Sequence, residues 1–142
     1  MIKKIDHINI SVTNLESATA FFCQLGFSIE RERVLEGEWI DRVVGMENVK
    51  AAFVSLCLPG AETKIELLQY ISPKGESNPE IDKASQIGFR HVAFSVDDVQ
   101  ELYDQLKEKN INFFSNIQTN PYGKKMCYFH GPDNIILELA EF

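Results

Sequence analysis

The sequence has few cysteines, no long apolar run and no excess of basic residues. Its 142 residues include three cysteines, Cys23, Cys57 and Cys127, and no Cys-x-x-Cys pair. This usage is typical of reduced core thiols in a cytoplasmic protein, and it disfavours a disulfide framework or a closed zinc site built on cysteine. The start of the chain has no signal-peptide pattern, which agrees with a cytoplasmic location.

The charge balance also excludes classes of partner. Acidic residues outnumber basic ones by 21 to 14, which gives a formal net charge of −7. Such a surface repels the phosphates of nucleic acids and of anionic lipids. No apolar stretch is long enough to cross a bilayer. We therefore expect a small-molecule substrate, and neither nucleic acid nor a membrane, as the partner of a single globular domain.

The chain contains the same pattern twice. Residues 5–12 read IDHINISV and residues 89–96 read FRHVAFSV, while KIELL at 64–68 is echoed by ILELA at 136–140. Each copy thus carries one histidine and one glutamate at matching places. These residues are His7 with Glu66, and His91 with Glu138.

Each copy predicts one strand, one helix and three further strands, because period-2 segments alternate with one apolar stripe of helical spacing. In the first copy the strands are expected near 4–12, 27–34, 50–59 and 63–71, with a helix capped by Thr13 or Asn14 and ending at Gly26. In the second copy they are expected near 89–96, 112–115, 125–130 and 134–141, with a helix capped by Asp97 and Asp98 and ending near Asn110.

The segment between the copies, residues 72–88, is rich in proline and glycine and predicts a connector. The chain is thus expected to be one α+β domain with module one at 1–71 and module two at 89–142. The first module is about a dozen residues longer than the second between its histidine and its glutamate. The extra residues, 35–47, include Trp39 and are expected to form a loop over one end of a sheet.

Side-chain alternation indicates which way the repeated residues face. Ile8 and Ile10 share one face of the first strand, so His7 and Asn9 lie on the other. Glu138 stands between leucines on a strand of central character, where a carboxylate is costly unless it is paired, protonated or bound to a metal. Imidazole and carboxylate ligands suit Zn²⁺, Fe²⁺, Mn²⁺, Ni²⁺ or Co²⁺.

A simpler interpretation exists for each of these residues alone. A single strand histidine is usually a hydrogen-bonded structural residue, and a half-buried glutamate usually faces solvent or pairs with a lysine, here Lys64. The repetition favours the metal site, because chance does not easily place the same two residue types at equivalent points of both copies. His7, Glu66, His91 and Glu138 are therefore the predicted ligands of one divalent ion.

The residues that carry this pattern resemble the vicinal oxygen chelate superfamily, which includes glyoxalase I, methylmalonyl-CoA epimerase, extradiol dioxygenases and fosfomycin- and bleomycin-resistance proteins. The similar motifs are DHI at 6–8, FFCQLGF at 21–27, IELL at 65–68, RHVAF at 90–94 and YFHGPDNIILEL at 128–139. The resemblance implies two tandem βαβββ modules that form a cup-shaped mixed sheet around a divalent metal, with helices on the outer faces. The modules pair within one chain or across a homodimer, and a homodimer is expected.

Among these relatives, glyoxalase I matches at all four ligand places. The resemblance therefore implies a metal-dependent lyase or isomerase that transfers a proton next to a carbonyl, on a hemithioacetal or an acyl-CoA thioester. Glu138 is expected to bind the metal and to swing away from it to act as the base, with Glu66 as its catalytic counterpart. The residues expected to contact substrate are Tyr128, Asn9, Arg31 and Lys125.

Two alternatives stay open at this point. A ferrous dioxygenase is favoured by Tyr128 but lacks an acid–base histidine ahead of His91, because His130 is expected to be exposed in a turn. A protein that sequesters small molecules is disfavoured by the presence of all four ligands.

Overall fold

The computed structural model describes all residues, 1–142, and the chain divides into two compact units, Met1–Ser77 and Asn78–Phe142. The division falls inside the predicted connector. Each unit has its own four-stranded mixed sheet. The predicted α+β class with two βαβββ modules is confirmed.

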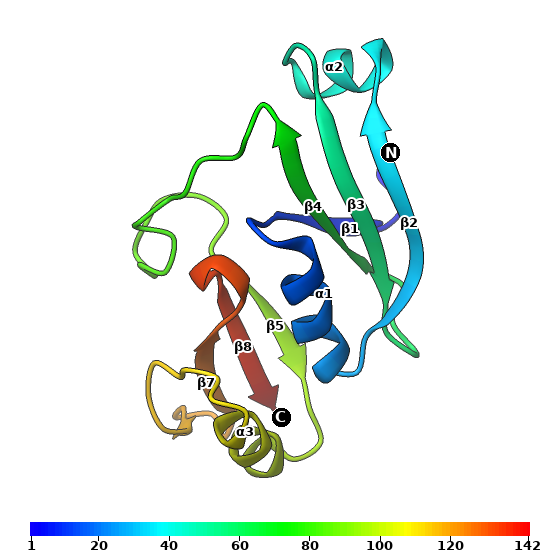
Figure 1. Cartoon of the computed structure of the whole chain (residues 1–142). Helices are drawn as coiled ribbons and strands as arrows, with labels where there is room; N and C mark the ends of the chain where they lie inside the picture. Colours follow the sequence, from blue (N-terminus) through cyan, green and yellow to red (C-terminus); the bar gives the residue numbers. More distant parts are fainter. The chain divides into compact units, whose positions relative to one another are not determined.

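The first unit holds a sheet of order β1-β4-β3-β2 (Figure 1). Its elements are β1 (His7–Ser11), α1 (Leu15–Gln24), β2 (Ser28–Glu36), α2 (Glu38–Val44), β3 (Lys50–Cys57) and β4 (Lys64–Ser72). β1 runs parallel to β4, and the other neighbours are antiparallel. The strand that carries Glu66 therefore lies inside the sheet, directly beside the strand that carries His7.

The second unit repeats this topology with the order β5-β8-β7-β6. Its elements are β5 (His91–Ser95), α3 (Val99–Glu108), β6 (Gln118–Thr119), β7 (Lys125–His130), a 3₁₀ turn (Pro132–Asn134) and β8 (Ile136–Glu141). β5 is parallel to β8, and β7 is antiparallel to it. Glu138 thus occupies the central strand β8, between the strands that carry His91 and Tyr128.

The strand register is the same in both units. His7 pairs with Lys64, two residues before Glu66, and His91 pairs with Ile136, two residues before Glu138. In each unit the histidine and the glutamate therefore project from the same face of two adjacent parallel strands.

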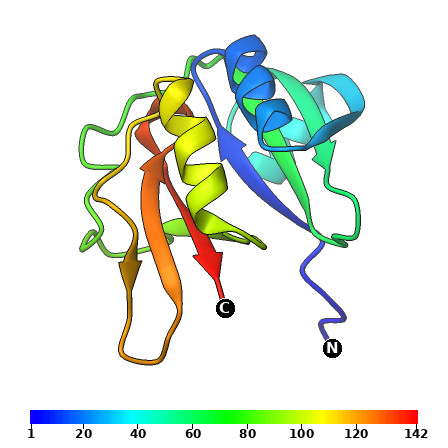
Figure 2. The same ribbon diagram turned by 90° about the horizontal axis from the view of Figure 1, so that it is seen from below.

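In each unit the helix covers the sheet face opposite to the histidine and the glutamate. One hydrogen bond between the helix and the sheet shows this in each unit. The N–H of Leu15, the first residue of α1, donates to Gln69 Oε1 at 2.8 Å. The N–H of Val99, the first residue of α3, donates to Glu141 Oε2 at 2.9 Å. Both acceptors stand three residues after the glutamate, so they face the other way. Figure 2 shows α3 lying against one face of its sheet.

The local signals at the helix starts are confirmed: Asn14 caps α1 through Ser17 N, and Asp98 caps α3 through Glu101 N. Two other predictions are wrong. The insertion at 35–47 contains the short helix α2, whose Ile40 is buried and which ends at the left-handed Gly45.

The second wrong prediction concerns the strand expected at 112–115. That segment makes only an isolated bridge, Phe113 to Phe129, and the edge strand β6 forms later in the chain. The packing of Phe113 explains the difference, because its ring contacts Tyr103 of α3 at a centroid distance of 4.4 Å.

The three cysteines are all free, but only Cys127 is buried. Cys23 is exposed near the end of α1 and Cys57 is half-buried, so the interpretation of all three as core residues is wrong. The structure contains no helix that is both long and apolar enough to cross a membrane.

Candidate metal centre

The first unit forms one imidazole–carboxylate pair. His7 Nε2 lies 3.2 Å from Glu66 Oε2. The other ring nitrogen, Nδ1, lies 2.9 Å from Asp6 Oδ2, and this hydrogen bond lowers the pKa of the Asp6 carboxyl. When Nδ1–H donates this hydrogen bond to the carboxylate, Nε2 is the ring nitrogen that is left to bind a metal, as in histidine ligands of metals.

The lysine nearest in sequence does not neutralise Glu66. Lys64 Nζ instead binds Glu30 Oε1 at 2.7 Å, and Ser55 Oγ donates to Glu30 Oε2 at 3.0 Å. The ammonium of Lys64, more than the hydroxyl of Ser55, lowers the pKa of the Glu30 carboxyl. The simpler interpretation, in which Glu66 pairs with Lys64, is therefore wrong, and Glu66 is left to His7.

The second unit forms the matching pair in a more buried setting. His91 Nε2 lies 3.0 Å from Glu138 Oε2, and the Glu138 side chain is only 3% exposed. Its second oxygen, Oε1, lies 2.9 Å from Lys124 Nζ. The ammonium stands outside the direction of a hydrogen bond to Oε1, which has no hydrogen-bond partner, so the contact is ionic.

Both pairs have the donor chemistry and spacing of metal ligands. Two atoms about 2.1 Å from one ion lie roughly 3.0–3.4 Å apart for angles between a right angle and a tetrahedral one. The observed N···O separations of 3.2 and 3.0 Å fit that range. Neither unit gathers three His, Cys, Asp or Glu side chains into one group. Each unit therefore contributes one imidazole–carboxylate pair.

Two of the predicted substrate residues lie beside the glutamates. Asn9 is the register partner of Glu66 in β1. Tyr128 is the register partner of Glu138 in β7, and its ring lies 4.9 Å from the His91 ring. Arg31 is exposed in the edge strand β2, where it pairs with Ser55, the antiparallel neighbour of Glu66. Asn9 and Tyr128 therefore border the imidazole–carboxylate pairs, whereas Arg31 lies two strands away from Glu66.

Lys125 is not brought to Glu138. Its ammonium binds Glu141 Oε1 at 2.8 Å on the face that carries α3, which raises the pKa of Lys125 and lowers that of Glu141. The preceding residue, Lys124, is on the Glu138 face instead. Strand alternation in the sequence could have identified Lys124 as the lysine on this face. Lys124 is an even number of residues from Tyr128, whereas Lys125 is an odd number away.

His130 is not in an exposed turn, contrary to the sequence-based expectation. It is the last residue of β7, and its side chain is 23% exposed. Its ring stacks on Phe114 at 4.4 Å, and its Nε2 lies 3.3 Å from Asp82 Oδ2. Phe114 also meets the Tyr128 ring edge-on at 5.8 Å. A row of aromatic rings therefore extends from His91 along this face of the sheet.

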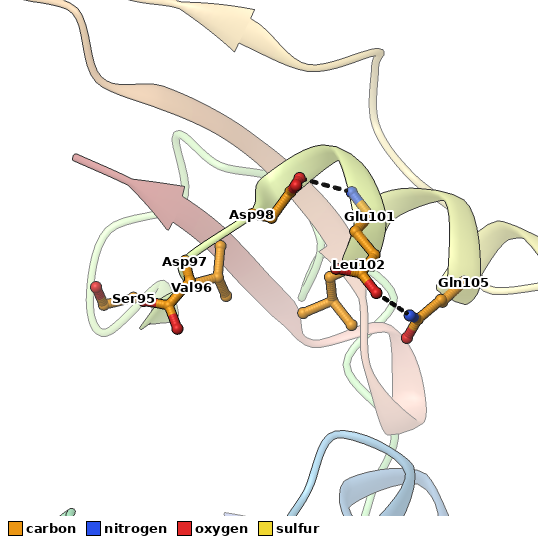
Figure 3. Close-up of a pocket in the computed structure, with 7 residues that line it drawn as sticks. All are labelled: Ser95, Val96, Asp97, Asp98, Glu101, Leu102 and Gln105. Atoms are coloured by element: carbon orange, nitrogen blue, oxygen red, sulfur yellow. Dashed lines mark hydrogen bonds between the residues drawn. The ribbon is translucent and has the colours of Figure 1, made fainter.

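A cavity of about 390 Å³ lies elsewhere in the second unit, at the start of α3 (Figure 3). Its lining includes Asp97, Asp98 and Glu101, but neither His91 nor Glu138. The polar groups on the helix already bind one another, since Asp98 accepts from the Glu101 N–H and the Glu101 carboxylate accepts from the Gln105 amide. This cavity is not part of the candidate site.

Comparison with known proteins extends over both units. Residues 4–139 match the family described as the Glyoxalase/Bleomycin resistance protein/Dioxygenase superfamily. The chain is 32% identical to the uncharacterized protein YaeR of Escherichia coli (strain K12), with 99% of this chain and 97% of YaeR covered. It is 27% identical to the mitochondrial methylmalonyl-CoA epimerase of Homo sapiens, with 97% and 73% covered. A solved structure of a glyoxalase family protein from Bacillus cereus superposes with a TM-score of 0.91 at 25% identity, with 99% and 95% covered.

Proposed function

Because the chain belongs to the Glyoxalase/Bleomycin resistance protein/Dioxygenase superfamily, we propose that it is a divalent-metal-dependent enzyme that transfers a proton next to a carbonyl group. One observation carries the proposal: each unit sets an imidazole Nε2 within 3.2 Å of a glutamate oxygen, in the same strand register. His7, Glu66, His91 and Glu138 are the proposed ligands of one ion of Zn, Ni, Mn, Co or Fe.

An ion held by these four residues would supply Lewis acidity to polarise a substrate carbonyl and to stabilise the negative charge that develops when the adjacent proton leaves. The carboxylates move that proton. Glu66 has the greater freedom, since its side chain is 20% exposed and no lysine contacts it. Glu138 is held between His91 and Lys124. In place of the swinging Glu138 expected from the sequence, we therefore assign the larger movement during proton transfer to Glu66, with Glu138 as the more static carboxylate.

The residues around the pairs support a substrate with polar and planar parts. The Asn9 amide and the Tyr128 hydroxyl border the two carboxylates and supply hydrogen bonds to substrate oxygens. Arg31, on the exposed edge strand, supplies a positive charge for an anionic group. The relative from Homo sapiens is an epimerase of an acyl-CoA thioester, which makes thioesters the first substrates to test.

The test combines metal analysis with a substrate panel. The protein is stripped, reconstituted separately with Ni²⁺, Zn²⁺, Mn²⁺, Co²⁺ and Fe²⁺, and assayed with hemithioacetals, acyl-CoA thioesters and catechols. We expect tight binding of a redox-silent ion and exchange or isomerisation on the first two classes. His7→Ala and His91→Ala should each weaken metal binding by tenfold or more.

Two results would contradict this function. Oxygen consumption on catechols with Fe²⁺ alone would indicate a dioxygenase. Tight ligand capture with no metal bound would indicate a sequestering protein. His130→Ala serves as the matched control, because this histidine binds Asp82 and is not among the proposed ligands. It should leave metal binding unchanged.

A further inference from the structure

Lys124 is held in place by the hairpin turn that joins β6 to β7. Asn120 Oδ1 accepts the N–H groups of Tyr122 and Lys124 at 2.9 and 3.1 Å, and Asn120 N–H donates to Lys124 O at 2.9 Å. Gly123 supplies the left-handed conformation that the turn requires, with φ +91°. The turn therefore fixes the backbone of Lys124 independently of the contacts that its side chain makes.

The side chain of Lys124 reaches along the sheet to Glu138. Its Nζ lies 2.9 Å from Glu138 Oε1 and 5.1 Å from the centroid of the Phe142 ring, and the side chain is 24% exposed. A carboxylate as buried as Glu138 needs a counter-charge to remain ionised in the fold. Lys124 supplies that charge on one oxygen, while the other oxygen faces His91.

The first unit has no equivalent of this contact. Its nearest lysine, Lys64, is bound to Glu30, so Glu66 meets only the imidazole of His7. The two half-sites thus share their ligands and their register but differ in charge. Glu138 lies against an ammonium group as well as its histidine, whereas Glu66 lies against its histidine alone.

We propose that Lys124 is the internal counter-ion of Glu138 and competes with a divalent cation for this carboxylate. The proposal rests on the metal-dependent function proposed above. An ion bound to Glu138 Oε2 and His91 Nε2 would stand beside the ammonium of Lys124, and like charges at that distance repel. Lys124 therefore stabilises Glu138 before the metal arrives and lowers the affinity of the complete site for the metal. It is a positioning residue that acts through Glu138.

The test is a titration of the full chain with Co²⁺ alone, followed by its absorption spectrum and by calorimetry, and repeated with Zn²⁺. Lys124→Met keeps the aliphatic length and removes the charge. We expect it to bind both ions about tenfold more tightly. The Coulomb repulsion between a dication and an ammonium roughly 5 Å apart corresponds to about that factor in the dissociation constant, even with water-like screening. Lys124→Arg keeps the charge and should bind as the unaltered protein does.

The adjacent lysine offers a matched control. Lys125→Met removes the same charge one residue away, but Lys125 is bound to Glu141 on the opposite face. It should leave the affinity within twofold of the original. If Lys124→Met does not fold, Lys124→Gln replaces it, because its amide can hydrogen-bond to Glu138 without a charge, and the same tightening is expected.

The outcomes separate the two proposals. Metal binding by the unaltered protein together with unchanged or weaker binding by the neutral Lys124 variants would overturn the competition and leave the metal-dependent function intact. Equal tightening by Lys125→Met would also overturn it, since a general charge effect would then suffice. No binding of either ion by any of the proteins would overturn both proposals.

Discussion

Two glutamates that look equivalent in the sequence lie in different surroundings. Glu66 and Glu138 occupy the same register position of their sheets, yet their side chains are 20% and 3% exposed. The repeat predicted that each would share a face with its histidine, and the structure brings each pair together. The repeat in the sequence could not predict which lysine contacts which carboxylate. Those contacts depend on a bulge near Glu30 and on the turn before β7.

The Cys127 thiol provides a prediction at this scale. Burial, and secondarily the nearby charge of Glu138, raise the pKa of Cys127 to about 11. Since the thiolate is the reactive form, only about a thousandth of Cys127 is nucleophilic at pH 8. We expect N-ethylmaleimide at pH 8 to label the exposed Cys23 rapidly and to spare Cys127 in the folded protein.

Peptide mass spectrometry over a time course measures this difference. Labelling of Cys127 should rise steeply as the pH approaches 11, provided that the protein stays folded, and should become complete at pH 8 in denaturant. Cys23→Ser serves as the control, because the rapid phase should disappear with it. Rapid labelling of Cys127 at pH 8 without denaturant would show that its thiol is not buried as described.

The sequence predicts a helix or strand correctly where the local pattern is compatible with only one structure. The helices begin at Asn14 and Asp98 because their side chains bond to N–H groups that the first turn leaves unpaired. The segment 112–115 shows the opposite case. Its apolar residues suit a strand, but Phe113 packs against Tyr103 and Phe129 instead. Hydrophobic periodicity predicts burial there and does not distinguish a strand from a packed loop.

The insertion at 35–47 was misjudged for a related reason. Its helix α2 is too short to show a clear apolar stripe, and it depends on contacts beyond its own residues. The Asp41 carboxylate accepts the N–H groups of Asn48 and Val49 at 3.1 and 2.8 Å, which closes the loop behind the helix. Such contacts form only once the chain has folded back, so composition alone suggested a loop.

The contacts that hold the helix starts to the sheets provide a prediction at the scale of the element. Gln69→Ala removes the acceptor of the Leu15 N–H and should lower the free energy of unfolding by about 1 kcal/mol. Urea unfolding followed by circular dichroism measures the change. Gln105→Ala is the control, since that amide bonds only to Glu101 on an exposed helix face. Equal losses from the two variants would show that the contact between helix and sheet contributes nothing specific.

At the scale of the whole molecule, the duplication predicted the α+β class. Each unit is complete as a fold, with its own core, its own sheet and its own helix docked through an equivalent contact. Each unit holds one imidazole and one carboxylate of the proposed ligand set. The proposed metal-dependent function therefore depends on residues of both units.

This division predicts how metal should affect stability. If one ion takes ligands from both pairs, binding stabilises both units together, by about 2.7 kcal/mol when the free ion is at a hundred times its Kd. Hydrogen exchange should then slow in β1 and β4 as well as in β5 and β8 when Zn²⁺ is added. His7→Ala should weaken the effect in the second unit, although the substituted residue lies in the first. His91→Ala should weaken it in the first unit by the same argument, and His130→Ala should preserve it in both. Protection confined to one unit would mean that the ion is bound by one pair alone, and the two copies of the motif would then have to be assigned separate roles.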